Sequence, residues 1–449
     1  MSLTTTKSEA WINRDKKVIA PCQHLSYYPL TVQKVEGEII YDQDNNRFID
    51  FLSSASSLNL GSGFPMITEA LINQMKLYVQ YTPAYIYNTP NIAYAERLTS
   101  VYPGGIQAKV CFGNCGSDAN DAAIKFARAF TGRSKIITFI NGYHGNTYGS
   151  MSLSAVTTRM RSKMGPFLPD IFSFPFYGDD LDNEVCQGEC TREIERAFET
   201  YLPAEEVAAV IIEPVQGDAG LIPAHGIFMN KLHALCKKNG ILFISEEVQQ
   251  AFFRTGKWFA IEHYDIVPDG IILGKSVGGS LPLGAFMARG EIMDSLPAPA
   301  HLFTLGGHAL ACATGCAAFD YMQGADFQDI LAKNENAMED YLNEIMKKFP
   351  EFVTQKRGKG MSRGLVLTKQ DQRTGEIVPD EIGTYKVLYR AYEKGLVMIS
   401  LGKNVLRIQP PLNIKPENLK RGFEIIDEAI EEYLDEKISD EVLKYREGW

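Results

Sequence analysis

Short apolar runs alternate with helical patterns from about residue 105 onward, and this alternation restricts the fold more than any other feature of the sequence. The apolar runs predict strands at residues 109–112, 135–140, 207–213, 241–246, 270–273 and 283–288. The helical patterns between them include residues 118–130, 226–238 and 308–322. Strands that alternate with helices in this way are typical of an α/β domain built around a mainly parallel sheet.

The two ends of the chain have a different texture and predict a second, smaller domain. Residues 37–51 alternate around a polar turn, as a hairpin does. After about residue 325 the sequence predicts a charged helix, short strands near Leu365 and over residues 396–408, and an amphipathic helix over residues 416–434. We therefore expect an N-terminal arm, a large domain and a C-terminal segment that completes a small α+β domain, at residues 1–60, 61–325 and 326–449.

Charge and hydropathy exclude several classes of protein. The net charge of −10 argues against nucleic acid or an anionic membrane as the partner. No apolar run approaches the roughly 20 residues of a membrane span, and the N-terminus lacks the apolar core of a secretory signal. We therefore expect a cytoplasmic protein that does not contact membranes.

Eight cysteines raise the question of disulfides or a metal. A chain of this length can bury a large core without a disulfide framework. Six of the cysteines form close pairs: Cys111/Cys115, Cys186/Cys190 and Cys312/Cys316. None of the pairs has the two-residue spacing usual for zinc, so we expect no metal site.

Lys275 lies at the end of a predicted strand, where residues 270–273 pass into a loop rich in glycine and serine. Burial lowers the pKa of an amine, which makes a lysine a usable nucleophile and base. The common chemical use of such a lysine is a Schiff base with a carbonyl or with pyridoxal phosphate. Taken alone, Lys275 is better explained as a strand-end lysine whose ammonium reaches water.

Two further strands end in turns that suit a ligand. Gly116 and Ser117 lie where a strand passes into a helix, and free backbone N–H groups at such a turn bind phosphate. An ordinary helix start capped by Ser117 or Asp118 explains the same residues. Tyr143 follows the next strand and can stack on a flat ring, while its neighbour His144 is as easily structural as acidic.

Two more strands end in carboxylates, at Glu213 and at Glu246. Acidic residues at strand ends are often only solvated, but a carboxylate there can also hold the protonated pyridine nitrogen of pyridoxal phosphate. Because the carboxyl ends of parallel strands meet at one edge of a sheet, a phosphate turn, an aromatic ring, a carboxylate and a lysine converge there. This convergence predicts a pyridoxal-phosphate site.

Six ordered motifs resemble those of the class III aminotransferases, a family of fold type I enzymes that use pyridoxal 5'-phosphate. The motifs are FGNCGSDANDAAIKFARAFTGR, NGYHG, IIEPVQGDAG, ILFISEEVQQAFFRTGK, PDGIILGKSVGGSLPLGA and FTLGGHALAC. The resemblance covers nearly the whole chain. It implies a mainly parallel seven-stranded sheet between helices, pyridoxal 5'-phosphate as the cofactor, and an amino acid, with a 2-oxo acid in transamination, as the substrate.

The resemblance also implies roles for residues at the sheet edge. Lys275 forms the Schiff base with the cofactor, and Gly116 with Ser117 holds the cofactor's phosphate. Tyr143 stacks on the pyridine ring, and Gln249 reaches the ring hydroxyl.

Other implied roles concern the substrate and a second subunit. Thr304 reaches the phosphate of the neighbouring subunit's cofactor, so the active unit is a homodimer, alone or as a dimer of dimers. Glu213 and Arg407 match a pair that, in the 4-aminobutyrate type, selects between substrates with and without an α-carboxylate. Tyr85 is a candidate for one wall of the substrate pocket.

The sequence departs from the family pattern at the cofactor ring and at the substrate pocket. Glu246 stands where the family usually has aspartate, so the same charge is carried on a side chain longer by one methylene. Ala251 and Phe253 replace usual glycines. Ser62 with Phe64 replaces a common histidine-containing pattern.

Within the family, the chain most resembles the branched-chain amino-acid 2-epimerases of lactic acid bacteria. Shared features are SASSLNLGSG, YTPAYIYNTP, GNCGSDANDAAIKFARA, PAHLFT and a chain that ends in Gly448-Trp449. Inversion at Cα needs a second acid or base on the face away from Lys275. Asp218, on the turn after the Glu213 strand, is our candidate, and a turn residue that caps local N–H groups explains it nearly as well.

Three functions are compatible with these residues. A 2-epimerase or racemase of branched-chain amino acids such as isoleucine is the first expectation. A 4-aminobutyrate, or other ω-amino-acid, aminotransferase with 2-oxoglutarate is the alternative, favoured by Glu213 and Arg407. A non-catalytic binding protein on the same fold is the third, and Lys275 argues against it.

Overall fold

The computed structural model describes residues 3–446, so the terminal Gly448-Trp449 of the epimerase resemblance lies outside the described residues. The described residues form two compact units. One unit comprises residues 65–324, and the other comprises residues 3–64 and 325–446. The domain boundaries expected from the sequence stay a prediction. Within residues 3–446, no helix is long and apolar enough to cross a membrane.

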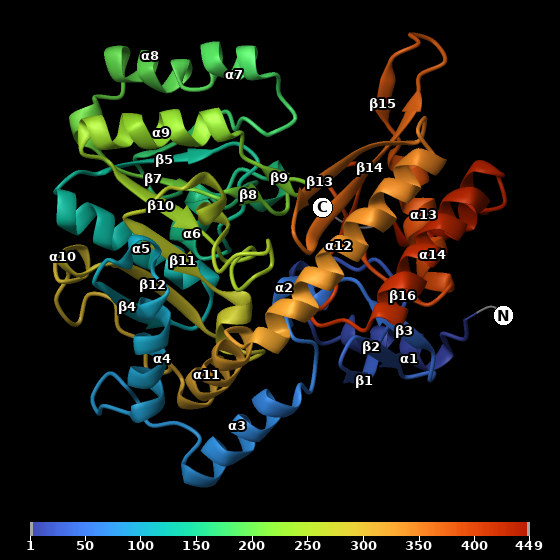
Figure 1. Cartoon of the computed structure of the whole chain (residues 1–449), viewed down its shortest axis with the longest axis horizontal. Coiled ribbons are helices and arrows are strands. Elements are labelled where there is room, and N and C mark those ends of the chain that lie inside the picture. Colours follow the sequence, from blue (N-terminus) through green and yellow to red (C-terminus); the bar gives the residue numbers. More distant parts are fainter. Residues whose placement is uncertain (1–2, 447–449) are drawn as a thin grey trace. The chain divides into compact units, whose positions relative to one another are not determined.

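A seven-stranded sheet forms the centre of the 65–324 unit, in the order β4-β12-β11-β10-β7-β5-β6 (Figure 1). β12 is antiparallel to both its neighbours, and the other strands run parallel to one another. The strands are β4 (Ala108–Gly113), β5 (Lys135–Phe139), β6 (Ile171–Phe174), β7 (Val207–Ile212), β10 (Leu242–Glu246), β11 (Gly270–Leu273) and β12 (Gly284–Arg289). A short hairpin, β8 (Val215–Gln216) with β9 (Ile222–Pro223), follows β7.

Helices of the same unit separate most of these strands along the chain. They are α3 (Pro65–Leu77), α4 (Thr89–Ser100), α5 (Gly116–Thr131), α6 (Tyr148–Leu153), α7 (Asn183–Glu189), α8 (Arg192–Thr200), α9 (Gly226–Asn239), α10 (Gly290–Met293) and α11 (Ala309–Met322). α5 follows β4, α9 precedes β10, and α10 follows β12, with at most two residues between helix and strand.

The helices α5 and α9 cover opposite faces of the sheet. Along β10, Leu242 and Ile244 join the hydrophobic cluster that α5 forms with the strands. Phe243, between them, lies edge-on to His233 of α9, with the ring centroids 5.3 Å apart. Successive side chains of a strand point to opposite faces, so the sheet has a helix layer on each side. This confirms the predicted α/β fold, with a mainly parallel sheet between helices.

The sequence pattern does not predict the edge strand β6 or the helices α7 and α8. All three lie between residues 160 and 205, where proline, glycine and acidic residues interrupt any periodic pattern. β6 is only four residues long and lies between Pro169 and Pro175, so it is too short to show a period. The other strands of the sheet differ from the predicted ranges by at most one residue at either end.

The other unit contains two small sheets. The first has the order β1 (Val32–Glu36), β2 (Ile39–Asp42), β3 (Arg47–Asp50), β16 (Leu396–Val397), and it includes the predicted hairpin. The second has the order β13 (Val353–Lys359), β14 (Ser362–Gln370), β18 (Val405–Ile408), β17 (Ile399–Leu401), with β15 (Ile377–Pro379) beside β14. The longer helices are α1 (Thr6–Asp15), α12 (Ala325–Lys348), α13 (Glu381–Glu393) and α14 (Pro416–Leu434). Because β16 pairs with β3, the N-terminal and C-terminal segments share one sheet.

Candidate active site

The carboxyl ends of the parallel strands gather most of the predicted site residues. Open α/β sheets bind ligands at this edge. The residues are Gly116 and Ser117 after β4, Tyr143 after β5, Glu213 and Asp218 after β7, Glu246 and Gln249 at the end of β10, and Lys275 after β11. Glu246 is the last residue of β10, and Asp218 lies in the β8–β9 hairpin that follows β7. The other residues lie on turns that follow a strand.

The turn before α5 presents backbone N–H groups at the positive end of a 16-residue helix. The Asp118 carboxylate accepts hydrogen bonds from the N–H groups of Asn114 (2.7 Å) and Cys115 (3.0 Å), which fixes the shape of the turn. A Cβ at Gly116 would lie 2.7 Å from a methyl group of Val248, so the close packing here requires glycine. Because its carboxylate accepts these two hydrogen bonds, Asp118 rather than Ser117 is the side chain that caps the start of α5.

Asn146 joins the turn after β5 to the turn before α5. Its N–H donates to Ser117 Oγ (3.1 Å), and its side-chain amide donates to the Tyr143 hydroxyl (3.3 Å). Burial, with neighbouring carboxylates, raises the pKa of Tyr143 to about 12, so the hydroxyl keeps its proton. Burial lowers the pKa of His144 to about 3, so this side chain is neutral and structural rather than an acid.

Buried carboxylates at the sheet edge include Glu213, which is 6% exposed, and Glu246, which is 3% exposed. Glu213 accepts hydrogen bonds from the N–H groups of Tyr143 (3.1 Å) and Gly217 (3.2 Å). Burial raises the pKa of Glu213 to about 8, although Lys275 lowers it. Burial and the charge of Glu213 raise the pKa of Glu246 well above its ordinary value, again opposed by Lys275. Both carboxyl groups therefore hold protons more tightly than they would in water, and a cation placed beside them would be stabilised in place of those protons.

Lys275 begins the short 3-10 turn η6 (Lys275–Gly278) and has a φ of +49°. For a residue with a side chain, this left-handed conformation costs about 1–2 kcal/mol. The side chain is half-buried and interacts electrostatically with Glu213 and Glu246. Strained backbone conformations cluster at active sites, and Lys275 combines one with a partly buried amine.

Asp218 lies on the turn between β8 and β9 and is 7% exposed. Its Oδ1 accepts a hydrogen bond from Nε2 of Gln249 (3.4 Å), and Oε1 of Gln249 accepts one from Nε2 of Gln250 (3.3 Å). The Gln249 side chain also packs closely against Gly217, where an added Cβ would lie 2.5 Å from Oε1 of Gln249. The hydrogen bonds thus tie Asp218 to the turn after β10.

Asn120 also belongs to this region, although the sequence did not predict it as a site residue. It is fully buried on α5, and its amide donates to the carbonyl oxygens of Gly116 (3.0 Å) and His144 (3.0 Å). The same side chain interacts with the Glu246 carboxylate. Asn120 therefore links three of the turns at the sheet edge. Only its position, four residues after Gly116 in a predicted helix, could have indicated this.

A family model for class-III aminotransferases matches residues 22–430. The chain belongs to this family. Class-III aminotransferases depend on pyridoxal 5'-phosphate, so the protein is an enzyme that uses this cofactor. The similarity extends over both units described above.

Several named enzymes are similar to this class-III aminotransferase over most of its length. The chain is 37% identical to the isoleucine 2-epimerase of Lentilactobacillus buchneri, over 94% of each chain. It is 35% identical to the leucine/methionine racemase of Thermococcus litoralis, over 99% of this chain and 100% of the other. It is 32% identical to a probable 4-aminobutyrate aminotransferase of Bacillus subtilis, over 88% of this chain and 92% of the other.

A solved structure of the same fold contains the cofactor. It is the taurine:2-oxoglutarate aminotransferase of Bifidobacterium kashiwanohense, in complex with pyridoxal phosphate and glutamate. The TM-score is 0.86 at 28% sequence identity, and the match covers 98% of this chain and 100% of that chain.

The residues at the sheet edge of this class-III aminotransferase fit pyridoxal 5'-phosphate. The start of α5 offers N–H groups and the Ser117 hydroxyl to a phosphate. The buried Glu213 and Glu246 carboxylates favour a cation, and the protonated pyridine nitrogen is one. Lys275 places an amine in the same cluster, and an amine is the group with which an aldehyde forms a Schiff base. The donor set therefore suits a phosphorylated cationic ring that carries an aldehyde.

One departure from the family pattern strains the backbone. Phe253 replaces a usual glycine and has a φ of +62°, a conformation that glycine adopts without strain. Its ring packs against Trp258, with the ring centroids 4.5 Å apart. The N–H of Phe253 also donates to the carbonyl oxygen of Lys257 (3.0 Å). Aromatic packing and this turn hydrogen bond thus offset the strain.

Two predicted site residues of the 65–324 unit are exposed outside the cluster, and a third belongs to the other unit. Tyr85, on the segment between α3 and α4, is 78% exposed, and Thr304 is exposed on the loop before α11. Arg407 belongs to the other unit, on β18, and is 1% exposed. Its Nε donates to the side-chain oxygen of Gln409, which also accepts from Ser56 Oγ (2.8 Å).

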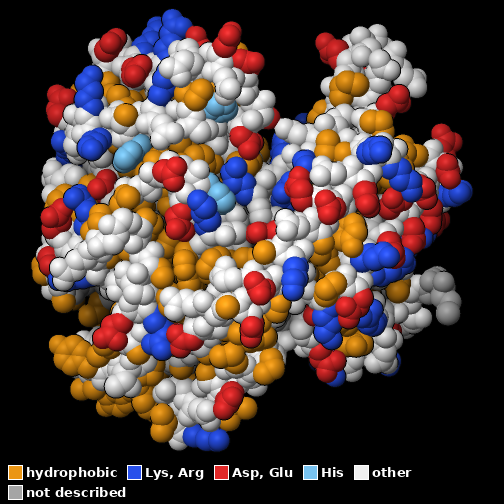
Figure 2. Space-filling view, viewed as in Figure 1, with side chains coloured by type: hydrophobic (Ala, Val, Ile, Leu, Met, Phe, Trp, Pro, Cys, Tyr) orange, Lys and Arg blue, Asp and Glu red, His pale blue; other side chains and the backbone are white. Residues whose placement is uncertain are grey.

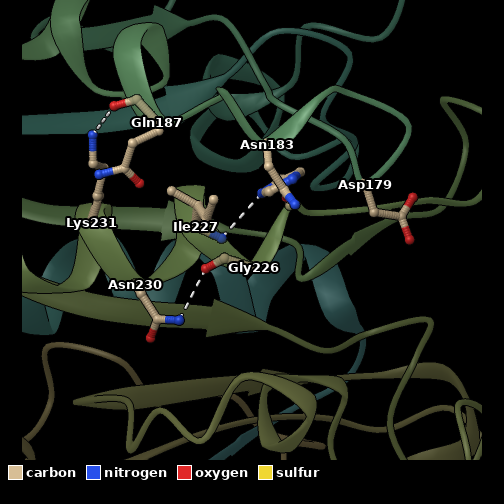
Figure 3. Close-up of a pocket in the computed structure, with 8 residues that line it drawn as sticks. Asp179, Asn183, Gln187, Gly226, Ile227, Asn230 and Lys231 are labelled. Carbon is tan, nitrogen blue, oxygen red and sulfur yellow. Dashed lines mark hydrogen bonds between the residues drawn. The ribbon is translucent and has the colours of Figure 1, made fainter. Parts of the chain in front are cut away.

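A surface groove of about 630 Å³ lies away from the cluster, between α7 and the start of α9 (Figure 3). Figure 3 shows Lys231 of α9 reaching toward α7, where its Nζ donates to the carbonyl oxygen of Gln187. The groove is lined by Asp179, Asn183, Gln187, His225, Gly226, Ile227, Asn230 and Lys231. It contains none of the predicted site residues.

Proposed function

We propose that this class-III aminotransferase inverts the Cα configuration of branched-chain amino acids such as isoleucine. The observation that carries the proposal is the presence of Asp218, a second side chain able to carry a proton, at the same sheet edge as Lys275. Transamination uses one such group, whereas inversion uses two. The similarity to an isoleucine 2-epimerase and a leucine/methionine racemase supports the same choice.

In this proposal the residues of the sheet edge hold the cofactor. Pyridoxal 5'-phosphate, when bound, supplies an electron sink that acidifies the Cα–H of an amino acid. Gly116 and Ser117 bind its phosphate, and Tyr143 stacks on its ring. Gln249 reaches the ring hydroxyl, and Glu246 balances the charge of the pyridine nitrogen.

Two residues move the protons. Lys275 removes the proton of Cα on one face, and Asp218 delivers a proton to the opposite face. For the reverse reaction the two residues exchange roles. The hydrogen bond from Gln249 orients Asp218, and Gln250 in turn orients Gln249.

A second candidate function is a 4-aminobutyrate aminotransferase with 2-oxoglutarate. The specific observation that favours it is a buried carboxylate and a buried guanidinium, Glu213 and Arg407, at positions that match the family's substrate-selecting pair. The similarity to a probable 4-aminobutyrate aminotransferase supports it too. In this case Arg407 binds the carboxylate of an oxo acid, and Tyr85 forms one wall of the pocket.

The test is to incubate the cofactor-loaded enzyme with L-isoleucine in heavy water, without any oxo acid. Chiral chromatography and mass spectrometry of the amino acid follow. Accumulation of D-allo-isoleucine with deuterium at Cα is the expected result. An unchanged L-isoleucine, together with glutamate formation from 4-aminobutyrate and 2-oxoglutarate, would instead establish the second candidate.

We further propose that the active unit is a homodimer. Exposed apolar side chains gather on the segment that contains α3 and the start of α4, and such a patch is typical of a protein interface. Figure 2 shows hydrophobic side chains on the face where Figure 1 places α3 and α4. The segment's exposed apolar residues are Met66, Ile72, Met75, Leu77, Val79, Tyr81, Tyr85, Ile86, Tyr87 and Ile92. In a dimer, the partner covers this surface, and Thr304 reaches the partner's cofactor.

Light scattering after size-exclusion chromatography tests the assembly. A dimer has twice the chain mass of 50.1 kDa, and a dimer of dimers has four times that mass. The double variant Ile86→Glu with Tyr87→Glu is expected to be a monomer that binds the cofactor weakly. Tyr201→Glu, at an exposed tyrosine outside the patch, should leave the mass unchanged. A monomeric wild-type enzyme with full activity would contradict the proposal.

A further inference from the structure

The turn that carries Lys275 is held by two buried side chains from helices outside it. On α4, Tyr94 is fully buried, and its hydroxyl donates to the carbonyl oxygen of Val277. On α11, Thr314 is also fully buried, and its hydroxyl lies within hydrogen-bond distance of the carbonyl oxygen of Gly278 (2.8 Å), as well as of Leu310 (2.9 Å) and Ala311 (3.1 Å) in its own helix. Both bonds therefore end within three residues of the lysine.

The backbone of Lys275 needs such support because its φ of +49° is strained. Inside the turn, the N–H of Val277 donates to the carbonyl oxygen of Gly274 (3.0 Å). This bond is local, and a turn that had shifted as a whole would keep it. The bonds from α4 and α11 are different, because they fix the turn relative to the rest of the unit.

The contact of Tyr94 with the turn depends on Gly315 of α11. A Cβ at Gly315 would lie 2.6 Å from the Tyr94 ring and 2.8 Å from the carbonyl oxygen of Val277. On β4, Phe112 stacks on the same tyrosine, with the ring centroids 6.0 Å apart. The ring is thus fixed by packing, with its hydroxyl directed at Val277.

We propose that Tyr94 is a positioning residue for Lys275. Its hydroxyl fixes the Val277 carbonyl and so holds the strained backbone conformation from which the lysine side chain projects. The inference rests on the role of Lys275 in the proposed function. It deepens that role, because it names what keeps the amine in place without itself touching substrate or cofactor.

Tyr102 is a matched control in the same unit. It is 3% exposed, and its hydroxyl donates to the carbonyl oxygen of Pro268 (2.8 Å), two residues before β11. The two tyrosines therefore bind carbonyl oxygens at opposite ends of one strand. Only the bond made by Tyr94 lies on the side of Lys275.

The variants Tyr94→Phe and Tyr102→Phe each remove one buried hydroxyl and keep the ring. Because each loses one hydrogen bond to a backbone carbonyl, the two should lose similar stability. For Tyr94→Phe alone, we expect kcat for isoleucine inversion to fall about tenfold, as for a slightly misplaced reacting group, with KM nearly unchanged. Its cofactor-loaded form should also show a displaced pH midpoint of the visible absorbance band, which reports the proton on the lysine–cofactor linkage.

Gly315→Ala attacks the same contact without removing the hydroxyl. Alanine favours a helix over glycine, so α11 itself gains from this change. The added methyl group nevertheless pushes the Tyr94 ring and Val277 apart, and we expect the same displaced absorbance midpoint. This variant keeps the proposal testable if Tyr94→Phe folds poorly.

Equal effects of Tyr94→Phe and Tyr102→Phe on kcat and on the absorbance midpoint would overturn the inference. Lys275→Ala separates this failure from a failure of the proposed function. If Lys275→Ala still forms a cofactor linkage that borohydride reduces, the proposed function is wrong. If the linkage is lost but the two tyrosine variants behave alike, only the positioning role of Tyr94 is wrong.

Discussion

Two clusters of buried charge, one in each unit, are stabilised in opposite ways. At the edge of the large sheet, Glu213 and Glu246 lie close to each other, and burial raises the pKa of both. On β18, the Arg407 guanidinium donates to the neutral side chain of Gln409, which is held by Ser56. A carboxylate can lose its charge by binding a proton, but a guanidinium cannot. The charge of the sheet edge therefore depends on pH and on the bound cofactor, whereas the charge on β18 is permanent.

The largest expected effect comes from Asp218, another buried carboxylate of the sheet edge. Asp218→Asn removes the proton carrier but can still interact with Gln249 through its amide. We expect inversion of L-isoleucine to fall by about 10²- to 10⁴-fold, the usual range for loss of a general acid or base. Deuterium from heavy water should still enter the L-isomer at Cα, because Lys275 remains.

Chiral chromatography with mass spectrometry measures both quantities for Asp218→Asn. The control is Asp180→Asn, at an exposed aspartate, which should invert L-isoleucine as the wild-type enzyme does. Undiminished inversion by Asp218→Asn would remove this carboxylate from the mechanism and leave the sheet edge with one proton carrier.

A substitution at Gln409 tests whether the orientation of Arg407 on β18 matters for substrate binding. Gln409→Leu removes the oxygen that accepts from Arg407, and a lost hydrogen bond to a buried charge costs about 1.5–3 kcal/mol. If Arg407 binds the substrate carboxylate, KM should rise about tenfold while kcat changes little. Steady-state kinetics with L-isoleucine gives both constants.

Asn404→Leu is the matched control for Gln409→Leu. Asn404 lies in the same sheet region, and its amide donates to the carbonyl oxygen of Leu367 (2.6 Å). This variant should lose stability without a change in KM. An equal rise of KM in both variants would show that the sheet, rather than the orientation of Arg407, determines substrate affinity.

The titratable charge of the sheet edge predicts a pH-dependent stability of the cofactor-free enzyme. The folded-state pKa of Glu213, about 8, lies above its ordinary value of 4.5, so between these values the unfolded chain binds fewer protons than the folded one. Stability should therefore fall as the pH rises from 4.5 to about 8. Glu213→Gln should flatten this slope of Tm against pH, and Glu199→Gln, at an exposed glutamate of α8, should not. An unchanged slope in Glu213→Gln would mean that Glu213 stays ionised throughout.

The sequence could predict which residues meet at the sheet edge because each of them is placed by the strand next to it in the chain. Lys275 and Tyr143 follow strands that an apolar run reveals, and Glu246 ends such a strand. Parallel strands bring their carboxyl ends to one edge. The motif resemblance then named their roles. No comparable rule exists for Tyr94, whose partner Val277 is 183 residues away in the chain.

The cluster around Arg407 illustrates what a sequence pattern cannot supply. Ser56 and Gln409 are 353 residues apart, and their hydrogen bond forms only once the two segments share a unit. The turn that carries Ser56 is also unexpected, because residues Ser53–Ser56 all have a positive φ, from +47° to +65°. Serine and alanine rarely adopt this conformation, and no pattern in SASSLNLGSG predicts it. Hydrogen bonds from the N–H groups of Leu52 and Ser53 to the Asp50 carboxylate, each 2.8 Å, support the start of the turn.

The smallest expected effect comes from this left-handed turn, which lies next to the Arg407 cluster through Ser56 and Gln409. Ser54 is exposed and has a φ of +47°, so Ser54→Gly relieves about 1–2 kcal/mol of strain against an entropic cost of about 0.5–1 kcal/mol. A net gain of about 0.5 kcal/mol in unfolding free energy follows from these two terms. Ser100→Gly, at an exposed serine in the last turn of α4, should change stability in the opposite direction. If Ser54→Gly raises Tm and leaves KM unchanged, the turn only connects β3 to the cluster. If Tm and KM rise together, the strain of the turn helps to hold Gln409 against Arg407. A strained backbone then positions the permanent charge on β18, as one positions the lysine at the sheet edge.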